Sequence, residues 1–509
     1  MANMANNVAT NRSPVAADER LVPLRFATKF GYSLGQVLDG IVSQSLGIFL
    51  FFYVTAVCGL PGGLAGIALA MGLAVDAVMD PLIGSASDGL RSRLGRRLPF
   101  MLVGLPLVAV LFVAIFALPT GLSTTALFVW VMILSVLLRI ALSLYTLPYQ
   151  ALGAELSDDY AERTSIMTWR WGLGVMGTVV AVTLGFAVFF RGAGGTLNRA
   201  GYLPFAATLA AIFIVATLFS LRSIATTLGR QHPAVARDGG LHLRVLRELR
   251  EVFQNQSFRI LFGSALLFFS ALGTHSTLGL HVNTFFWHFT SAQTQVVTMA
   301  VFVGLVLGAP LASPMIKRFE KRTVLLIGLA GLGLADTVPA ALRLLGLLPF
   351  QGAALMWTLA AIMFVGGVLL AAAAIAFASM MADAADEHEH LFGARREGLY
   401  FAGWSFAGKA AAGVGALIAG LVIQVIKFPA DLATHGGGAI VLPQMTINLL
   451  GFFYGPGAGV LYLGAILAIL RYRLDSGAHA TIMHDLRARR GNVGTEAHSA
   501  APTAPNPMI

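Results

Sequence analysis

Charged residues are scarce in this chain of 509 residues. Only 11% are Asp, Glu, Lys or Arg, 57% are hydrophobic, and the mean hydropathy is +0.77. Soluble globular proteins carry about 25% charged residues, so this composition excludes a water-soluble enzyme, and its hydrophobicity excludes a disordered chain. Cysteine is nearly absent as well. The single Cys58 excludes an intrachain disulfide and a cysteine metal cluster.

Long runs without charge dominate what is present. Residues 260–316 form a run of 57 residues without Asp, Glu, Lys or Arg. As one helix this run would be about 85 Å long, against about 30 Å for the hydrocarbon core of a bilayer, so it must contain two spans. Helices satisfy their own backbone groups in lipid, and these runs are too long for barrel strands. We therefore expect an all-α membrane protein with twelve transmembrane helices, near residues 30–57, 61–86, 98–118, 125–150, 168–190, 202–222, 259–287, 292–316, 323–345, 351–381, 397–426 and 443–471.

The basic residues indicate the orientation in the membrane. Of the 34 Lys and Arg residues, 28 lie in the tails and in the loops that follow spans 2, 4, 6, 8 and 10. This bias predicts that these loops and both termini are cytoplasmic. It also explains the net charge of +10 without a nucleic-acid partner. The first twenty residues are polar, so no cleavable signal peptide is expected there.

A hydrophilic segment in the middle divides the spans into six and six. Within it, residues 242–253 place leucines on one helical face and Arg244, Arg247 and Arg250 on the other, which predicts an amphipathic helix at the membrane surface. The halves also repeat weakly, because Asp80-Pro81-Leu82 and Ala309-Pro310-Leu311 each lead into a basic loop. Such a repeat is typical of the major facilitator fold. We expect a cytoplasmic N-terminal tail (1–27), an N-terminal six-helix bundle (28–222), a central cytoplasmic loop with the amphipathic helix (223–258), a C-terminal six-helix bundle (259–475) and a disordered cytoplasmic tail (476–509).

Three motifs carry a family resemblance. They are DAVMDPLIGSASDGLRSRLGRRLP (76–99), PYQALGAELSDDYAERTSIMTWR (148–170) and RREGLYFAGWSFAGKAAAGVGALIAG (395–420). In this order they resemble the glycoside–pentoside–hexuronide:cation symporters, a major facilitator branch that includes the melibiose permeases. The resemblance implies symport of a glycoside, uronide or related sugar with a monovalent cation, by alternating access across the cell membrane. The identity of the solute transfers less well, because relatives carry sugars, glucuronides and lysolipids.

Two carboxylates are the candidates for binding the coupling cation. Asp76 and Asp80 lie one helical turn apart and face the same way. By resemblance they bind H⁺ or Na⁺ together with Ser143, and Lys409 faces them from the eleventh helix. Met79 stands where the family has an asparagine. The loss of that polar side chain weakens the case for Na⁺ and so favours H⁺. The alternatives are that Asp80 is simply solvated near the cytoplasm and that Lys409 makes a structural ion pair between the halves.

The candidate solute site consists of a polar stripe on the fourth span and of residues on the first, fifth and eleventh spans. Arg139 and Thr146 share the stripe, and Thr146 replaces a sugar-binding aspartate of melibiose permeases. Arg139 adds a positive charge to this side of the expected cavity, and Thr146 leaves out a negative one. The cavity is therefore more positive there, which favours an acidic solute such as a uronide. Alternatively, Arg139 has a structural role in an ion pair with a neighbouring helix, and Tyr400 and Trp404 are packing residues that do not contact the solute. The candidate substrate-binding residues are Asp39, Arg139, Thr146, Gln150, Arg170, Tyr400, Trp404 and Ser405.

The remaining charged residues fall into two groups. Asp88, Arg93, Arg96 and Arg97 are expected to form a conformational latch at the cytoplasmic end. In the C-terminal half, His275 is expected to be a packed, hydrogen-bonded residue, with a proton relay as the alternative. Asp336 and Arg343, seven residues apart, are candidates for an intrahelical or water-bridged pair.

No catalytic residues, metal site, organic cofactor or obligate protein partner are expected. No G-x-x-x-x-G-K-[ST] motif occurs, so an ion gradient is the expected source of energy. The other functions left open are a lipid or amphiphile carrier of the same fold and a membrane enzyme or transport-dead sensor. Against an enzyme, the buried charges lack a nucleophile–base or metal arrangement.

Overall fold

The computed structural model describes residues 24–157, 159–192, 194–227, 250–393, 396–429, 432 and 442–499. All regular elements in these ranges are helices, in agreement with the expected all-α fold. The N-terminal half contains α2 (Phe26–Ser33), α3 (Gln36–Ser45), η1 (Leu46–Leu50), η2 (Tyr53–Val57), α4 (Gly62–Gly89), α5 (Leu98–Ile115), α6 (Thr124–Glu155), α7 (Tyr160–Leu184), η3 (Gly185–Phe189), η4 (Gly195–Leu197), η5 (Arg199–Gly201) and α8 (Tyr202–Ala225). The C-terminal half contains α10 (Gln256–His281), η7 (Val282–Phe286), α11 (Ser291–Arg318), α12 (Lys321–Leu344), α13 (Gly352–Phe392), α14 (Glu397–Val425), α15 (Gln444–Phe452), η9 (Phe453–Gly457), α16 (Ala458–Ile469) and α17 (Ser476–Ser499).

Eleven helices among the described residues are long and apolar enough to cross a membrane. They correspond to the second to twelfth expected spans. The first expected span, 30–57, is also helical, but it is divided into α2, α3, η1 and η2. Two wide π-helical turns, Leu46–Leu50 and Tyr53–Val57, interrupt it, so none of its pieces reaches the length of a continuous spanning helix.

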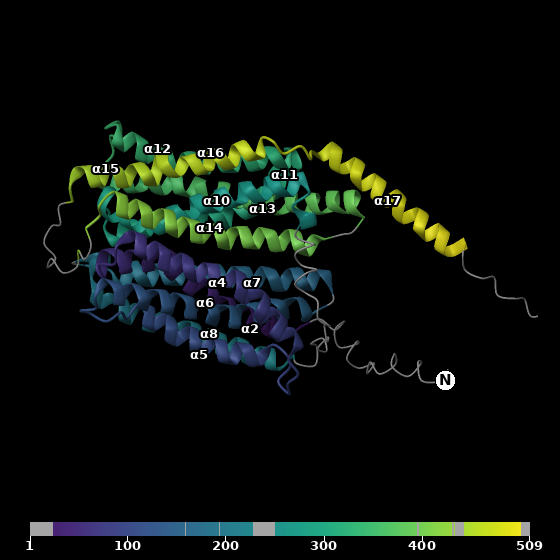
Figure 1. Ribbon diagram of the computed structural model, residues 1–509, viewed down its shortest axis with the longest axis horizontal. Coiled ribbons are helices and arrows are strands. Elements are labelled where there is room, and N and C mark those ends of the chain that lie inside the picture. Colours follow the sequence, from purple (N-terminus) through teal and green to yellow (C-terminus); the bar gives the residue numbers. More distant parts are fainter. Residues whose placement is uncertain are drawn as a thin grey trace, which may run out of the picture.

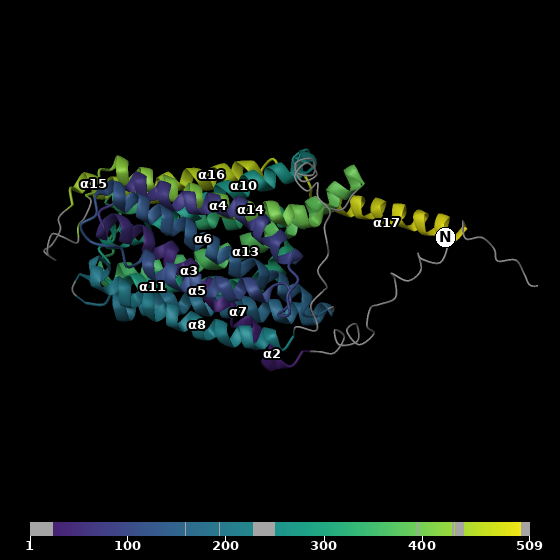
Figure 2. The same cartoon turned by 60° about the horizontal axis from the view of Figure 1, so that its bottom comes forward.

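The helices form two bundles that lie side by side (Figures 1 and 2). The two bundles repeat the same packing. Helix α6 packs on α4 and α5 in the first bundle, as α13 packs on α11 and α12 in the second. Likewise, α3 packs on α7 as α10 packs on α14. The repeated packing agrees with the weak internal repeat of the sequence.

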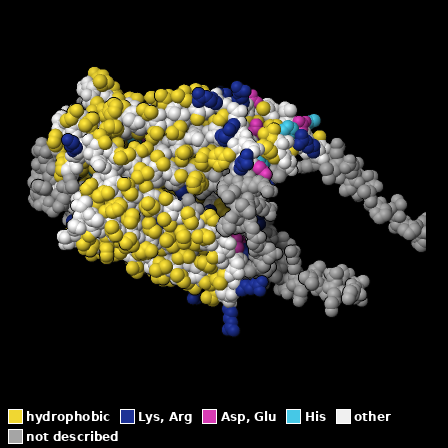
Figure 3. Space-filling model, viewed as in Figure 1, with side chains coloured by type: hydrophobic (Ala, Val, Ile, Leu, Met, Phe, Trp, Pro, Cys, Tyr) yellow, Lys and Arg dark blue, Asp and Glu magenta, His cyan; other side chains and the backbone are white. Residues whose placement is uncertain are grey.

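The outer surface of both bundles is apolar (Figure 3). Large side chains such as Val110, Phe219, Trp357 and Val460 are each at least 60% exposed. A contiguous apolar surface of this kind is unfavourable in water and favourable in hydrocarbon. Lys, Arg, Asp and Glu side chains gather instead at one end, on the right of Figure 3.

Two expected segments need comment. The central amphipathic helix lies almost wholly outside the described residues. The tail beyond residue 476, expected to be disordered, is helical as far as Ser499 in α17. The start of this helix is held in place, because Asp475 Oδ1 accepts from the Ala478 amide at 2.8 Å and the Ser476 hydroxyl donates to Glu320 at 2.5 Å.

Candidate functional site

The two bundles touch most closely at one end, where α4 begins and α14 ends. A Cβ added to Gly420 would lie 2.5 Å from the Gly62 carbonyl oxygen, and one added to Gly66 would lie 2.8 Å from that of Ala416. At the other end of α4, a Cβ on Gly84 would meet no atom within 4 Å. We call the first end the closed end. The second, which carries Arg96 and Arg97, is the basic end.

Hydrogen bonds between the bundles reinforce the closed end. The His281 ring nitrogen Nε2 lies 3.0 Å from the Thr55 hydroxyl, and both side chains are buried. The Ser276 hydroxyl donates to the Gly47 carbonyl at 3.3 Å, and the Ser291 hydroxyl donates to the Phe190 carbonyl at 2.5 Å. Gly47 and Thr55 lie in η1 and η2, and Phe190 directly follows η3, so the π-helical turns of the first bundle lie at this contact.

Further along the interface, Asp80 joins the two bundles. Its Oδ2 accepts a hydrogen bond from the Lys409 ammonium group, across the gap from α4 to α14. Its Oδ1 accepts from the Ser143 hydroxyl of α6 at 2.6 Å. One carboxylate oxygen of Asp80 therefore binds the opposite bundle, and the other binds a helix of its own bundle.

Asp76 lies one turn closer to the closed end and is more deeply buried. Its Oδ2 is 3.6 Å from Arg139 of α6, and its Oδ1 is buried without a hydrogen-bond partner among the described residues. Asp39 of α3 completes the cluster electrostatically, because it and both other carboxylates interact with Arg139. Asp39 also accepts from the Gln36 amide at 2.8 Å.

The charges of this cluster do not cancel. The carboxylates of Asp39, Asp76 and Asp80 face the two cations Arg139 and Lys409. If all are ionised, one negative charge remains, beside a buried carboxylate oxygen that has no partner among the described residues. Uncompensated charge at membrane depth costs several kcal/mol, so a bound positive charge would lower the energy of this cluster.

Several other expected solute-binding residues lie away from this cluster. The Thr146 hydroxyl donates within its own helix, to the Leu142 carbonyl at 2.9 Å. Arg170 lies beside Tyr32, toward the basic end. Gln150 and Ser405 are exposed and, among the described residues, take no part in the cluster.

The aromatic pair on α14 points into the C-terminal bundle. Tyr400 is 0% exposed and packs edge-on against Phe258. Trp404 packs against Phe269 and Phe377. These contacts match the packing alternative, and they leave Tyr400 no route to a solute between the bundles in this conformation.

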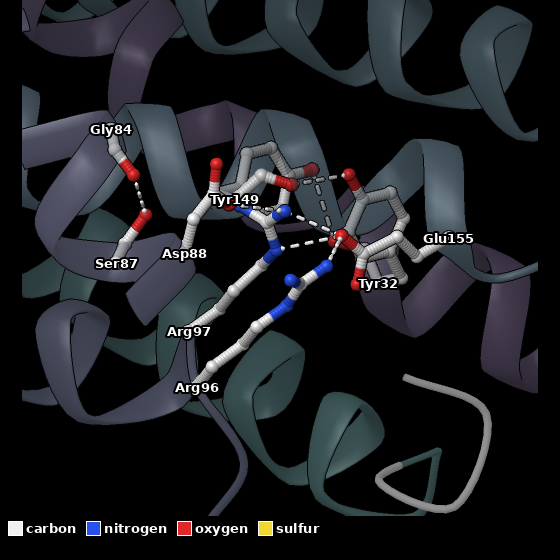
Figure 4. A network of polar contacts seen from close by, with 8 residues as sticks. All are labelled: Tyr32, Gly84, Ser87, Asp88, Arg96, Arg97, Tyr149 and Glu155. Atoms are coloured by element: carbon white, nitrogen blue, oxygen red, sulfur yellow. Dashed lines mark hydrogen bonds and ion pairs between the residues drawn. The ribbon is translucent and has the colours of Figure 1, made fainter. Parts of the chain in front are cut away.

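The expected latch residues meet an acidic partner that the sequence analysis did not assign. Arg96 and Arg97 both bind Glu155 at the end of α6, with Arg96 Nη2 at 2.5 Å from Oε1 (Figure 4). Arg97 also reaches Asp88 at 3.1 Å. The repeat suggests how Glu155 could have been found, since α13 of the second bundle carries Asp383, which binds Lys321 at 2.7 Å. Arg93 takes no part in this network among the described residues.

The C-terminal half differs from expectation at Arg343. Its guanidinium lies 5.1 Å and 5.2 Å from the ring centroids of Phe286 and Trp287, and not on Asp336. Asp336 contacts His275 and Tyr462 instead. Asp336 and Arg343 therefore make no direct ion pair with each other, because their side chains contact different neighbouring segments.

Comparisons with known proteins agree with this architecture. The family model described as MFS/sugar transport protein matches residues 31–476. An inner membrane symporter of Escherichia coli (strain K12) is 25% identical over 90% of this chain and 94% of its own. The isoprimeverose transporter of Lactiplantibacillus pentosus is 24% identical over 90% of each chain. The crystal structure of the nucleoside transporter NupG has the same fold, with a TM-score of 0.57 at 16% identity, over 88% of this chain and 99% of that one.

The match covers nearly all of the two bundles and includes the three motifs that resembled cation symporters. The eleven candidate spans agree with a multi-pass membrane protein. The chain belongs to the MFS/sugar transport protein family and is a membrane transporter and not an enzyme.

Proposed function

We propose that this protein couples the entry of a monovalent cation to the import of a glycoside, a uronide or a related sugar. The observation that carries the proposal is the cluster of three carboxylates and two cations at the interface of the bundles. It combines a net negative charge with an ion pair, Asp80–Lys409, that bridges the bundles. A cation bound there changes the strength of that bridge, which links ion binding to the relative movement of the bundles.

The orientation follows from the charge distribution. The basic end is the cytoplasmic end, with twelve spans and both termini inside, as the bias of Lys and Arg favours. The structure then corresponds to an inward-facing state, closed toward the outside by the contacts of Gly420, His281 and Ser276. The network of Glu155 with Arg96 and Arg97 acts as a latch that holds the loop after α4 against α6.

The coupling cation is H⁺ in this proposal. Asp80 already has both oxygens occupied by Ser143 and Lys409. The free oxygen of Asp76 is a single ligand, and Met79 offers none of the neutral oxygens that a dehydrated Na⁺ needs. A proton requires only one carboxylate, so it fits this site with fewer ligands.

Arg139 is the residue proposed to select the solute. Its side chain is 28% exposed and lies 3.6 Å from Asp76, so the guanidinium can contact both Asp76 and a solute that binds between the bundles. A guanidinium can bind a carboxylate through two parallel hydrogen bonds. An acidic solute would therefore compete with Asp76 for Arg139, and protonation of Asp76 would free Arg139 to bind it.

Uptake by proteoliposomes tests the proposal. We expect a radiolabelled glucuronide to accumulate when the outside is acidic, in the absence of Na⁺, and the outside medium to become more alkaline. Accumulation that needs Na⁺ at constant pH would contradict the choice of cation. Uptake that only equilibrates, whatever the gradient, would contradict coupled transport itself.

A further inference from the structure

A second group of titratable side chains lies inside the C-terminal bundle. Asp336 of α12 accepts a hydrogen bond from Tyr462 of α16, with 2.7 Å between the Tyr462 hydroxyl and Oδ2. Its other oxygen is 3.4 Å from Nε2 of His275 on α10. The opposite ring nitrogen of His275 is 3.3 Å from the hydroxyl of Tyr454, and these two rings stack at 3.9 Å. Three helical segments thus converge on one carboxylate.

The carboxylate is buried without a strong cation. Asp336 is only 4% exposed. Among the described residues, the titratable groups that act on it are His275 and the two tyrosines, and Arg343 on its own helix is directed to aromatic rings. The residues of α11 and α13 that face the same space, such as Thr298 and Met363, are uncharged. With Asp336 ionised and His275 neutral, the pair carries one net negative charge in a membrane-spanning bundle, a state that costs several kcal/mol.

One proton removes this charge. It can reside on the carboxyl group, which leaves both groups neutral, or on the imidazole, which gives an ion pair with no net charge. We propose that Asp336 and His275 form a proton-binding site in the C-terminal bundle, separate from the Asp76–Asp80 cluster, and that the bound proton favours closure of the closed end.

A cavity connects the pair with the interface of the bundles. Asp336, His275 and Tyr454 line it together with Gln44 of α3 and Phe186 of η3, which belong to the other bundle. Its volume of about 210 Å³ is sufficient for several water molecules, and although most of its lining is apolar, the side chains of Gln44, Asn283 and Thr298 offer them hydrogen-bond partners. Water and protons therefore reach the pair when the bundles separate at this end.

The same helix links the pair to the contacts of the closed end. Ser276, next to His275 in α10, donates to Gly47 of the opposite bundle, and His281 contacts Thr55. Closing these contacts removes the pair from bulk water. Dehydration penalises most the state in which Asp336 is ionised and His275 is neutral, because that state has a net charge. The closed arrangement is therefore favoured when the pair has bound one further proton.

Distances across the closed end test this inference. Spin labels are placed at Arg191→Cys and Met445→Cys, one in each bundle, in a Cys58→Ala background of the full-length protein in nanodiscs. We expect the label–label distance to shorten when the pH is lowered from alkaline to neutral. In Asp336→Asn, which is neutral at every pH, we expect the short distance throughout. The control Asp485→Asn removes an exposed carboxylate of α17 and should behave like the parent protein.

A second variant keeps the test decisive if Asp336→Asn does not fold. His275→Gln removes the imidazole, so the proton can only reside on the carboxyl group and is bound more weakly. We expect the midpoint of the distance change to move to lower pH. A parent protein with no pH-dependent distance, an Asp336→Asn variant with the parent's pH dependence, or an unchanged midpoint in His275→Gln would each overturn the inference. No solute is added and Asp76, Asp80 and Lys409 stay intact, so failure here leaves the proposed symport untouched.

Discussion

At the residue scale, the central cluster depends on the exact partners of two carboxylates. Both oxygens of Asp80 accept hydrogen bonds, from Ser143 and Lys409, whereas one oxygen of Asp76 has no hydrogen-bond partner among the described residues. The two residues are one turn apart, yet they have different tasks in the proposed mechanism. Asp80 connects the bundles, and Asp76 receives the cation.

Asparagine substitutions test this division. Asp76→Asn and Asp80→Asn should each abolish gradient-driven uptake while the side-chain volume is kept. The first removes the carboxylate that receives the cation, and the second removes the ion pair with Lys409 that joins the bundles. Both variants should remain folded in the membrane. Ser143→Ala removes one donor to the Asp80 carboxylate, a hydrogen bond of about 1.5 kcal/mol, so it should lower uptake about tenfold without abolishing it. Accumulation at the parent level by both asparagine variants would refute the assigned site.

Substitutions at Arg139 test the selection of an acidic solute. Lysine keeps the charge but not the fork of two donors, so Arg139→Lys should lower the affinity for a glucuronide about tenfold, and Arg139→Gln should lower it further. The measurement is competition of uptake by glucuronides and by the matching neutral glycosides. Equal competition by both classes in the parent protein would rule out an acidic solute. Loss of expression in both variants would indicate instead that the contact of Arg139 with Asp76 is structural.

Sequence patterns were sufficient for part of this site and insufficient for the rest. The one-turn spacing of Asp76 and Asp80 and the stripe containing Arg139 place these residues on shared faces of their helices. Spacing cannot tell which neighbour a face meets. Tyr400 and Trp404 share a face as expected, but that face packs against α10 and α13. His275 and Asp336 lie on separate helices, and their contact depends on how α10 and α12 pack.

At the element scale, the helix ends on the basic side are joined by ion pairs that repeat in both bundles. Glu155 at the end of α6 binds Arg96 and Arg97, and Asp383 near the end of α13 binds Lys321. The spans and the two halves could be predicted from the uncharged runs and the weak repeat. The division of the first span could not, because a π-helical turn has no distinct composition.

The two ion-pair networks should differ in strength. The Arg97 side chain is 7% exposed and that of Glu155 is 10% exposed, so Glu155→Gln leaves two guanidinium groups poorly compensated and should destabilise the protein by about 3 kcal/mol. Lys321 is 34% exposed and can be hydrated, so Asp383→Asn should cost about 1 kcal/mol or less. Thermal unfolding in detergent compares the two variants. Equal losses would show that burial does not distinguish the networks.

At the scale of the whole molecule, alternating access requires that the two bundles separate at the end where they now touch. The contact there is between backbones, since α4 and α14 meet at glycines. Long side chains would prevent this approach, and the sequence supplies small ones on both helices: Gly62, Gly66, Ala416 and Gly420. Gly420, the last residue of the third motif, thus acquires a physical role that the resemblance alone did not give.

A single methyl group at this contact should shift the conformational equilibrium. In Gly420→Ala the new Cβ would lie 2.5 Å from the Gly62 carbonyl and 2.9 Å from Gly66 Cα, so the helices must move apart. We expect transport to fall strongly and the closed end to open. Cys58, the only cysteine, directly follows η2 at this end and reports the change through faster labelling by a membrane-impermeant maleimide added from outside. The matched control is Gly263→Ala in α10, where a Cβ meets no atom within 4 Å and both transport and labelling should stay at the parent level. If Gly420→Ala labels no faster than Gly263→Ala, the glycine contact is not what closes the molecule.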